Sequence, residues 1–224
     1  MIVGVTGPSG VGKTTFCKYF SEKGCTYVDV DQIICKHDIF HIVGQIGRLL
    51  NDGINYAKKN NPNIVCKTLI INKKSTCKTR SLSLNNDAKI LLDEALSKWN
   101  PLVNEAILIA KKNNSKIIVV DFILLNLLDC WQNLDKRILI TKKDSKRMEH
   151  LKNRPHKFHK VDINEKLEHD FLQKRNSFFY YNHFRFDKKE LNFIVKNNNS
   201  KSDFLRIADK IYNIFEKESN NSKY

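Results

Sequence analysis

Residues 1–14 read MIVGVTGPSGVGKT, and this stretch decides the fold of the chain. Its first six residues are apolar and rich in β-branched side chains, which predicts a short buried strand. The next eight match the pattern Gly, four residues, then Gly-Lys-Ser/Thr, whose backbone N–H groups wrap around phosphate. Helical apolar spacing over residues 13–23 aims the positive end of a helix dipole at the same place. Together these features predict a nucleotide site.

The side chains that close this pattern have definite chemistry. Lys13 supplies a mobile positive charge that can follow a phosphoryl group during transfer. The Thr14 hydroxyl is suited to the coordination shell of Mg²⁺. We therefore expect ATP and Mg²⁺ as the bound nucleotide and metal ion.

Two later strands are expected to end in carboxylates. Residues 26–31 predict a strand that ends at Asp31, and residues 116–121 predict a fully buried strand that ends at Asp121. The carboxyl ends of parallel strands open onto one crevice, which also holds the phosphate loop. Asp31 is thus a candidate for activating an acceptor hydroxyl, with capping of a helix that begins near Gln32 as the alternative. Asp121 resembles a Walker B carboxylate that holds Mg²⁺ through water.

The remaining pattern alternates strands with helices. Further strands are predicted at residues 137–140 and 192–195, and helices at 41–50, 87–99, 102–112, about 164–181, and from a cap at Ser202 onward. Asn100-Pro101 is expected to separate two of these helices. Residues 55–86 lose periodicity, which indicates a mobile loop or an inserted segment. The predicted fold is a three-layer α/β phosphate-loop NTPase fold with a five-stranded parallel sheet.

Composition narrows the function classes. A chain of 224 residues is expected to form a single domain, residues 1–224. It has no apolar run that could span a membrane and opens directly on the predicted strand, so we expect a cytoplasmic protein. The net charge of +15 suits phosphorylated substrates, and no dedicated nucleic-acid partner is expected because interleaved aromatic and basic motifs are lacking. No Cys-x-x-Cys pair occurs among the six cysteines, which predicts reduced, buried thiols: Cys17, Cys25, Cys35, Cys66, Cys77 and Cys130.

Four segments in order resemble the dephospho-coenzyme A kinase family, which phosphorylates the ribose 3′-hydroxyl of dephospho-CoA with ATP in the last step of CoA biosynthesis. They are the opening stretch, Gly24-x-x-x-Val28-Asp29-Val30-Asp31, Asn100-Pro101-Leu102-Val103 and Asp121-Phe122-Ile123-Leu124-Leu125. The helix from Arg147 to Arg154 and the stretch Ile194-Val195-Lys196-Asn197 also look like the family's lid helix and last strand.

This resemblance implies roles for particular residues. Asp31 would accept or orient the acceptor hydroxyl proton, and Arg154 would swing in with the lid, which together with the helix after it covers residues 147–180. Asn197 would lie near the nucleotide base. A helical subdomain would lie on the acceptor side. The ATP phosphates would be cradled by Ser9, Gly10, Val11, Gly12, Lys13, Thr14 and Thr15.

The departures from the family's pattern fall on the acceptor side. The family's usual His is replaced by Asn100, its Pro by Ile123, and the acidic residue after the Leu-Leu pair by Leu127, and an expected Arg is absent near Tyr56. Phosphoryl transfer is therefore better supported than the identity of the acceptor. The alternatives are a nucleoside or nucleoside-monophosphate kinase and, from another class, a nucleic-acid-associated NTPase.

Overall fold

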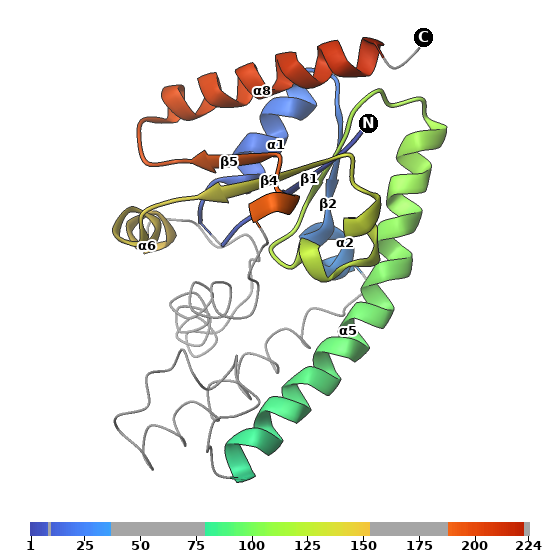
Figure 1. Ribbon diagram of the computed structural model, residues 1–224, viewed down its shortest axis with the longest axis vertical. Coiled ribbons are helices and arrows are strands. Elements are labelled where there is room, and N and C mark those ends of the chain that lie inside the picture. The colour runs from blue at the N-terminus through green and yellow to red at the C-terminus, as the bar shows by residue number, and fades with distance from the viewer. Residues whose placement is uncertain (9, 37–78, 153–187, 222–224) are drawn as a thin grey trace.

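Five parallel strands form one sheet at the centre of the part of the chain that the structure describes (Figure 1). This structure is a computed structural model, and it describes residues 1–8, 10–36, 79–152 and 188–221. The strands are β1 (Ile2–Thr6), β2 (Thr26–Asp29), β3 (Ile118–Asp121), β4 (Lys136–Thr141) and β5 (Phe193–Lys196). Their spatial order is β2-β3-β1-β4-β5, and each neighbouring pair is parallel. The expected sheet is confirmed.

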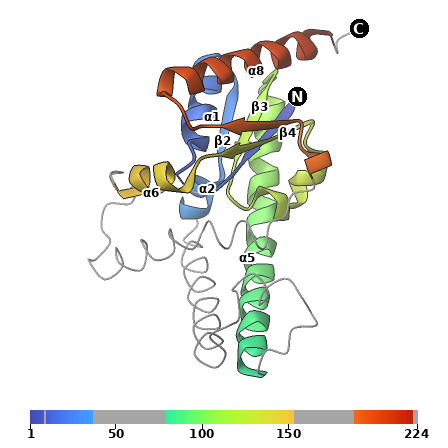
Figure 2. The ribbon, with the colours of Figure 1, turned by 60° about the vertical axis from the view of Figure 1, so that its left-hand side comes forward.

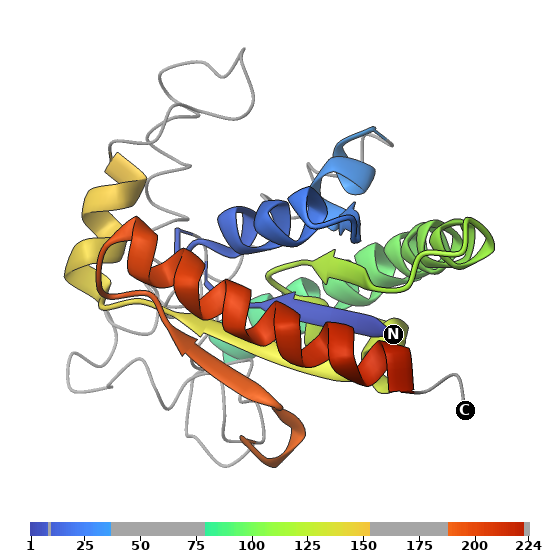
Figure 3. The same ribbon diagram turned by 90° about the horizontal axis from the view of Figure 1, so that it is seen from above.

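Helices cover both faces of the sheet, as parallel strands require of their crossover connections. The helices are α1 (Lys13–Glu22), α2 (Val30–Lys36), α5 (Thr79–Lys112), α6 (Asp144–Lys152) and α8 (Lys201–Asn221), with short 3₁₀ turns η1 (Leu125–Leu127), η2 (Asp129–Asn133) and η3 (Lys188–Glu190). Figure 3 looks down on α8, which lies at the top of Figure 1. This arrangement is the fold of the phosphate-loop kinases.

Alternate residues of the central strands feed two separate cores. In β3, Ile118 and Val120 pack with α2, α5 and the 3₁₀ turns, whereas Val119 packs with α1 and α8 on the other face. This follows from the two-residue period of a strand. All residues of β1 and β3 are buried, which explains why both strands read as continuous apolar runs in the sequence.

One continuous helix, α5, replaces the two helices expected around Pro101. It also includes residues 79–86, which were expected to belong to the loop or insertion. The apolar stripe of α5 keeps its phase across the proline, because Ala95, Trp99, Val103 and Ile107 are buried at four-residue intervals. Burial of this stripe therefore outweighs the hydrogen bond that the proline removes. Figure 2 shows the first turns of α5 extending well past the sheet.

Two further boundaries differ from expectation by two residues each. β2 ends at Asp29, and Asp31 lies in the first turn of α2 rather than at the end of the strand. The final helix is capped by Ser200 and not by Ser202, since the Ser200 hydroxyl accepts the Asp203 N–H at 3.1 Å. Both shifts reflect where the backbone stops pairing, which sequence periodicity locates only approximately.

Several expected features lie outside the described residues. These are the helix at 41–50, the greater part of the 55–86 segment, the lid beyond α6 and the helix at 164–181. No helix in the described part is long and apolar enough to cross a membrane.

Candidate active site

The loop after β1 has the backbone of a phosphate cradle. Gly7 has a φ of 147° and Gly12 a φ of 105°, conformations that residues with a Cβ rarely adopt. A Cβ on Gly7 would lie 2.3 Å from the Ile140 carbonyl oxygen, and one on Gly12 would lie 2.6 Å from Nδ2 of Asn197. The loop is thus closely packed against the carboxyl ends of β4 and β5. Ser9 lies outside the described residues.

The amino end of α1 has no side-chain cap and no acidic residue of its own. Gly12 occupies the N-cap position, no side chain caps the helix, and its first turn carries no acidic residue. The first N–H groups of a helix need acceptors from elsewhere, and the helix dipole favours a negative charge there. This end of α1 is therefore suited to receive a phosphate group. Val11 is buried beneath the loop, and Thr15 is half-buried in the first turn.

Lys13 and Thr14, at the start of α1, make hydrogen bonds to the phosphate loop and to β3, respectively. Nζ of Lys13 donates to the carbonyl oxygen of Pro8 at 3.4 Å. The Thr14 hydroxyl donates to Oδ2 of Asp121 at 3.4 Å. Lys13 also lowers the pKa of Asp121, so its ammonium lies close to that carboxylate. The structure thereby brings the adjacent residues Lys13 and Thr14 near Asp121, which lies 107 residues beyond Thr14 in the sequence.

Asp121 is a buried carboxyl group with one unused oxygen. Burial, with smaller contributions from Asp31 and Asp29, raises its pKa to about 6 despite the nearby Lys13. Its Oδ2 accepts hydrogen bonds from Thr14 and from the Tyr27 hydroxyl, whereas Oδ1 is buried and has no hydrogen-bond partner among the described residues. A buried carboxylate oxygen without a donor is costly in the bare protein. A hydrated Mg²⁺ would satisfy it, so these residues fit the expected metal ion.

The helix cap that was the alternative role for Asp31 is supplied by Asp29. Oδ1 of Asp29 accepts the N–H of Gln32 at 3.2 Å, so Asp29 takes the capping position that was considered for Asp31. Asp29 is paired in register with Asp121 across β2 and β3. Asp31 lies two residues further, in the first turn of α2, and contributes to the raised pKa of Asp121. The carboxylates of Asp29, Asp31 and Asp121 therefore gather at one end of the sheet.

Sequence reasoning missed Tyr27. Its hydroxyl donates to Oδ2 of Asp121 at 3.1 Å. The contact follows from the strand register: Tyr27 pairs with Val119, so it lies diagonally beside Asp121 on the same face of the sheet. Diagonal neighbours in adjacent strands are within reach of an aromatic side chain. The sequence alone could not predict this contact, because it does not reveal that β2 is next to β3 in the sheet.

Asn197 reaches the phosphate loop from the far end of the chain. Its side-chain amide donates to the carbonyl oxygen of Val11 at 2.8 Å, and its backbone N–H donates to Thr141 at 2.8 Å. The neighbouring Asn198 accepts the Lys143 N–H and the Lys146 ammonium at the start of α6. The turn after β5 thus connects the phosphate loop to α6. Arg154, the expected lid arginine, lies outside the described residues.

The acceptor-side departures have structural partners where they are described. Oδ1 of Asn100 accepts the Asp129 N–H at 3.0 Å. Ile123 and Leu127 are partly buried against the core, and the Ile123 carbonyl oxygen accepts the Thr6 hydroxyl at 3.3 Å. Tyr56 lies outside the described residues. The buried, reduced state expected for cysteines holds for Cys17, Cys25 and Cys130.

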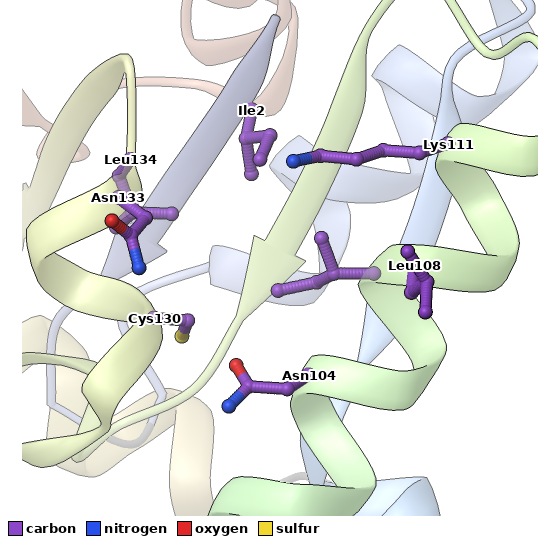
Figure 4. Close-up of a pocket in the computed structure, with 8 residues that line it drawn as sticks. Ile2, Asn104, Leu108, Lys111, Cys130, Asn133 and Leu134 are labelled. Atoms are coloured by element: carbon purple, nitrogen blue, oxygen red, sulfur yellow. The ribbon is translucent and has the colours of Figure 1, made fainter.

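A separate pocket of about 410 Å³ lies between α5 and η2 (Figure 4). It includes Ile2, the first residue of β1, so it lies at the opposite end of that strand from the phosphate loop. Figure 4 shows the Lys111 side chain reaching across toward Ile2, above Asn104 and Leu108 of the same helix. This pocket is distinct from the site built by Lys13, Thr14 and Asp121.

Comparisons with known proteins agree with this geometry. A family model described as an AAA domain matches residues 3–173. The crystal structure of TT1252 from Thermus thermophilus is 16% identical, covers 94% of this chain and 95% of its own, and superposes with a TM-score of 0.52, which shows a shared fold. Dephospho-CoA kinase from Campylobacter jejuni is 20% identical with a TM-score of 0.42, covering 96% of both chains.

Shikimate kinase from Acinetobacter baumannii, solved in complex with shikimate, is 13% identical with a TM-score of 0.41, covering 97% of this chain and 93% of its own. A search of curated proteins found no match.

Proposed function

The chain belongs to the AAA domain family, and we propose that it is a kinase that transfers the γ-phosphoryl group of ATP to a hydroxyl group of a small molecule. The observation that carries this proposal is that Thr14 is hydrogen-bonded to Asp121, with Lys13 nearby, at the uncapped amino end of α1. A cation, a neutral hydroxyl and a buried carboxylate next to anion-binding amides are the parts that phosphoryl transfer requires.

The nucleotide would be held by the phosphate loop. Backbone amides of residues 9–15 and the Lys13 ammonium would bind the phosphates, while Thr14 directly and Asp121 through water would hold Mg²⁺. When bound there, Mg²⁺ would supply positive charge to offset the negative charge that develops during transfer. Asn197 belongs to the nucleotide site in this proposal, and its hydrogen bond to Val11 supports that placement.

Asp31 is the proposed partner of the acceptor. The acceptor oxygen forms its bond to the γ-phosphorus as the bond to the bridging oxygen of ADP breaks, and the hydroxyl proton passes to the Asp31 carboxylate. Its place in the first turn of α2, near Asp121, supports this role. Arg154 would approach with the lid and complete the neutralisation of charge, while lid closure would exclude water from the transfer.

For the acceptor we propose the ribose 3′-hydroxyl of dephospho-CoA. The support is the set of segments that resemble dephospho-CoA kinases, of which residues 24–31 and 121–125 border the site described above. Asn100, Ile123 and Leu127 depart from that family's pattern, so the acceptor must be tested directly.

The decisive experiment is an acceptor panel read by ADP release. The purified chain is incubated with Mg²⁺ and ATP, alone or with dephospho-CoA, CoA, adenosine or AMP. CoA is the matched control, because it keeps the pantetheine arm while its 3′-hydroxyl is already phosphorylated. We expect ADP release with dephospho-CoA and none above background with CoA, and Lys13→Ala should remove the signal.

Other outcomes identify the alternatives. Preferred use of adenosine or AMP would assign a nucleoside or nucleoside-monophosphate kinase and reject dephospho-CoA as the acceptor. ATP hydrolysis that rises only when DNA or RNA is added, and that falls steeply with salt, would indicate a nucleic-acid-associated NTPase.

A further inference from the structure

Tyr27 connects β2 to the carboxylate at the end of β3. Its hydroxyl donates a 3.1 Å hydrogen bond to Oδ2 of Asp121, and its side chain is partly buried against the core beneath α1 and α8. The contact follows from the parallel register, in which Tyr27 pairs with Val119 and Asp29 pairs with Asp121. Because both strands are held by their ladder, the Tyr27 hydroxyl approaches Asp121 from a fixed backbone position.

The two oxygens of Asp121 are in contrasting environments. Oδ2 accepts two hydroxyl donors, Tyr27 at 3.1 Å and Thr14 at 3.4 Å, whereas no residue in the described ranges donates to Oδ1. If Thr14 ligates Mg²⁺ through its oxygen, its proton remains available to Oδ2. A second donor on the same oxygen restricts rotation of the carboxylate and keeps Oδ1 free.

Tyr27 is suited to act as a permanent donor. A tyrosine hydroxyl has an ordinary pKa of about 10, so at neutral pH it keeps the proton that it donates to Oδ2 of Asp121.

We propose that Tyr27 is a positioning residue for magnesium, which acts by holding Oδ2 of Asp121 so that Oδ1 receives the water shell of the metal ion. The inference rests on the proposed function, since it assumes that the phosphate loop binds ATP together with Mg²⁺. It adds a residue that the phosphate-loop pattern and the family resemblance did not assign. Tyr27 touches neither nucleotide nor acceptor in this proposal.

The test compares Tyr27→Phe with Tyr19→Phe. Both variants remove a tyrosine hydroxyl that donates to an aspartate, but Tyr19 lies on the far part of α1 and its partner is Asp209 of α8. Calorimetry measures the binding of a non-hydrolysable ATP analogue, first in EDTA and then over a series of Mg²⁺ concentrations. Thermal unfolding in EDTA reports whether each variant is folded, and Tyr27→Leu is the second variant if Tyr27→Phe does not fold.

We expect Tyr27→Phe to raise the Mg²⁺ concentration for half-maximal enhancement of analogue binding by about 10-fold or more, the usual effect of losing an outer-shell partner. Analogue binding in EDTA should change less than about 2-fold, because Tyr27 makes no contact with the phosphates. Tyr19→Phe should keep the wild-type Mg²⁺ dependence. In an Asp121→Asn background, Tyr27→Phe should add no further change, since the carboxylate that it positions is gone.

Failure of the proposed function and failure of the role of Tyr27 would give different results. A wild-type chain whose analogue binding does not respond to Mg²⁺ would overturn the proposed function and this inference with it. A responsive wild-type chain, with folded Tyr27→Phe matching its Mg²⁺ dependence, would overturn the role of Tyr27 alone. An equal shift in Tyr19→Phe would also overturn it, because the effect would then be one of general stability.

Discussion

The side-chain amide of Asn197 donates a 2.8 Å hydrogen bond to the carbonyl oxygen of Val11, across 186 residues of sequence. Nδ2 of Asn197 also occupies the space that a Cβ on Gly12 would need. The phosphate loop is therefore held in shape by the turn after β5, as well as by its own glycines. A loop that is already in its binding conformation loses less conformational entropy when it binds a ligand.

Removing that amide should weaken nucleotide binding. We expect Asn197→Ala to lose about 1–2 kcal/mol of unfolding free energy for the broken hydrogen bond and to lower ATP affinity by about 10-fold through a looser loop. Asn192→Ala is the matched control, because Oδ1 of Asn192 accepts the Arg137 N–H at 2.8 Å at the opposite end of β5. That variant should lose similar stability and keep its ATP affinity. Equal ATP affinities in all three proteins, measured by calorimetry, would contradict the proposed bracing of the loop.

Lys13 should be essential for turnover. Its ammonium is close to Asp121 and bonds back to Pro8 on the loop, where it can accompany the transferred phosphoryl group. We expect Lys13→Ala to reduce turnover by roughly 10²- to 10³-fold or more, as loss of a preorganised charge at a transition state does. Lys18→Ala, at an exposed position of the same helix, should retain full activity. Measured ADP release that is similar for the two variants would contradict this assignment.

Amide substitutions can distinguish the roles of Asp29 and Asp31 at the junction of β2 and α2. Asp31→Asn should keep ATP affinity within about 2-fold while transfer falls by about 10²- to 10⁴-fold, the usual contribution of a general base. Asp29→Asn should remain folded and active, because asparagine is an equally good cap for the Gln32 N–H. If Asp29→Asn lost transfer in steady-state assays and Asp31→Asn kept it, the acceptor carboxylate would be Asp29 instead.

Ionisation of Asp121 should lower the free energy of unfolding of the protein without nucleotide or Mg²⁺. Burial raises its pKa from 3.8 to about 6, which corresponds to about 3 kcal/mol at 1.36 kcal/mol per pKa unit. Because the pKa is raised in the folded state, the favourable contribution is complete below about pH 4 and is lost as the pH rises through about 6. Asp121→Asn cannot ionise, so its stability relative to wild type should increase by about 2–3 kcal/mol between pH 4 and pH 7.5.

Urea unfolding of both proteins in EDTA measures this difference, and subtracting the two profiles cancels the other titrating groups. Parallel profiles for wild type and Asp121→Asn would show that Asp121 titrates normally. The same variant should lose Mg²⁺-dependent turnover, so that stability and activity move in opposite directions.

Pro101 should destabilise α5. Its side chain is exposed in the middle of the helix, where it removes one backbone hydrogen bond. We expect Pro101→Ala to raise the free energy of unfolding by about 1–3 kcal/mol without altering ATP affinity, because the buried stripe of α5 is unchanged. A loss of stability in urea unfolding would mean that the proline is required for the path of the helix.

The sequence by itself determined the phosphate loop, the strands and their parallel arrangement. A strand of apolar residues followed by Gly7, Gly10 and Gly12 has few alternatives, because those backbone conformations exclude most side chains. The strands β1 and β3 were recognisable since a strand buried on both faces must be apolar throughout. Asp121 was likewise recognisable as the polar residue that ends such a run.

Tertiary structure alone decided where elements end and which side chains meet. The ladder between β2 and β3 stops at Asp29 and Asp121, which moved Asp31 from the strand into a helix. Packing of Trp99 and Val103 carried α5 through a proline that local propensity treats as a break. Tyr27 contacts Asp121, and Asn197 contacts Val11, only because distant segments of the chain become neighbours in the sheet. The order of the strands depends on long-range burial, which no local sequence pattern encodes.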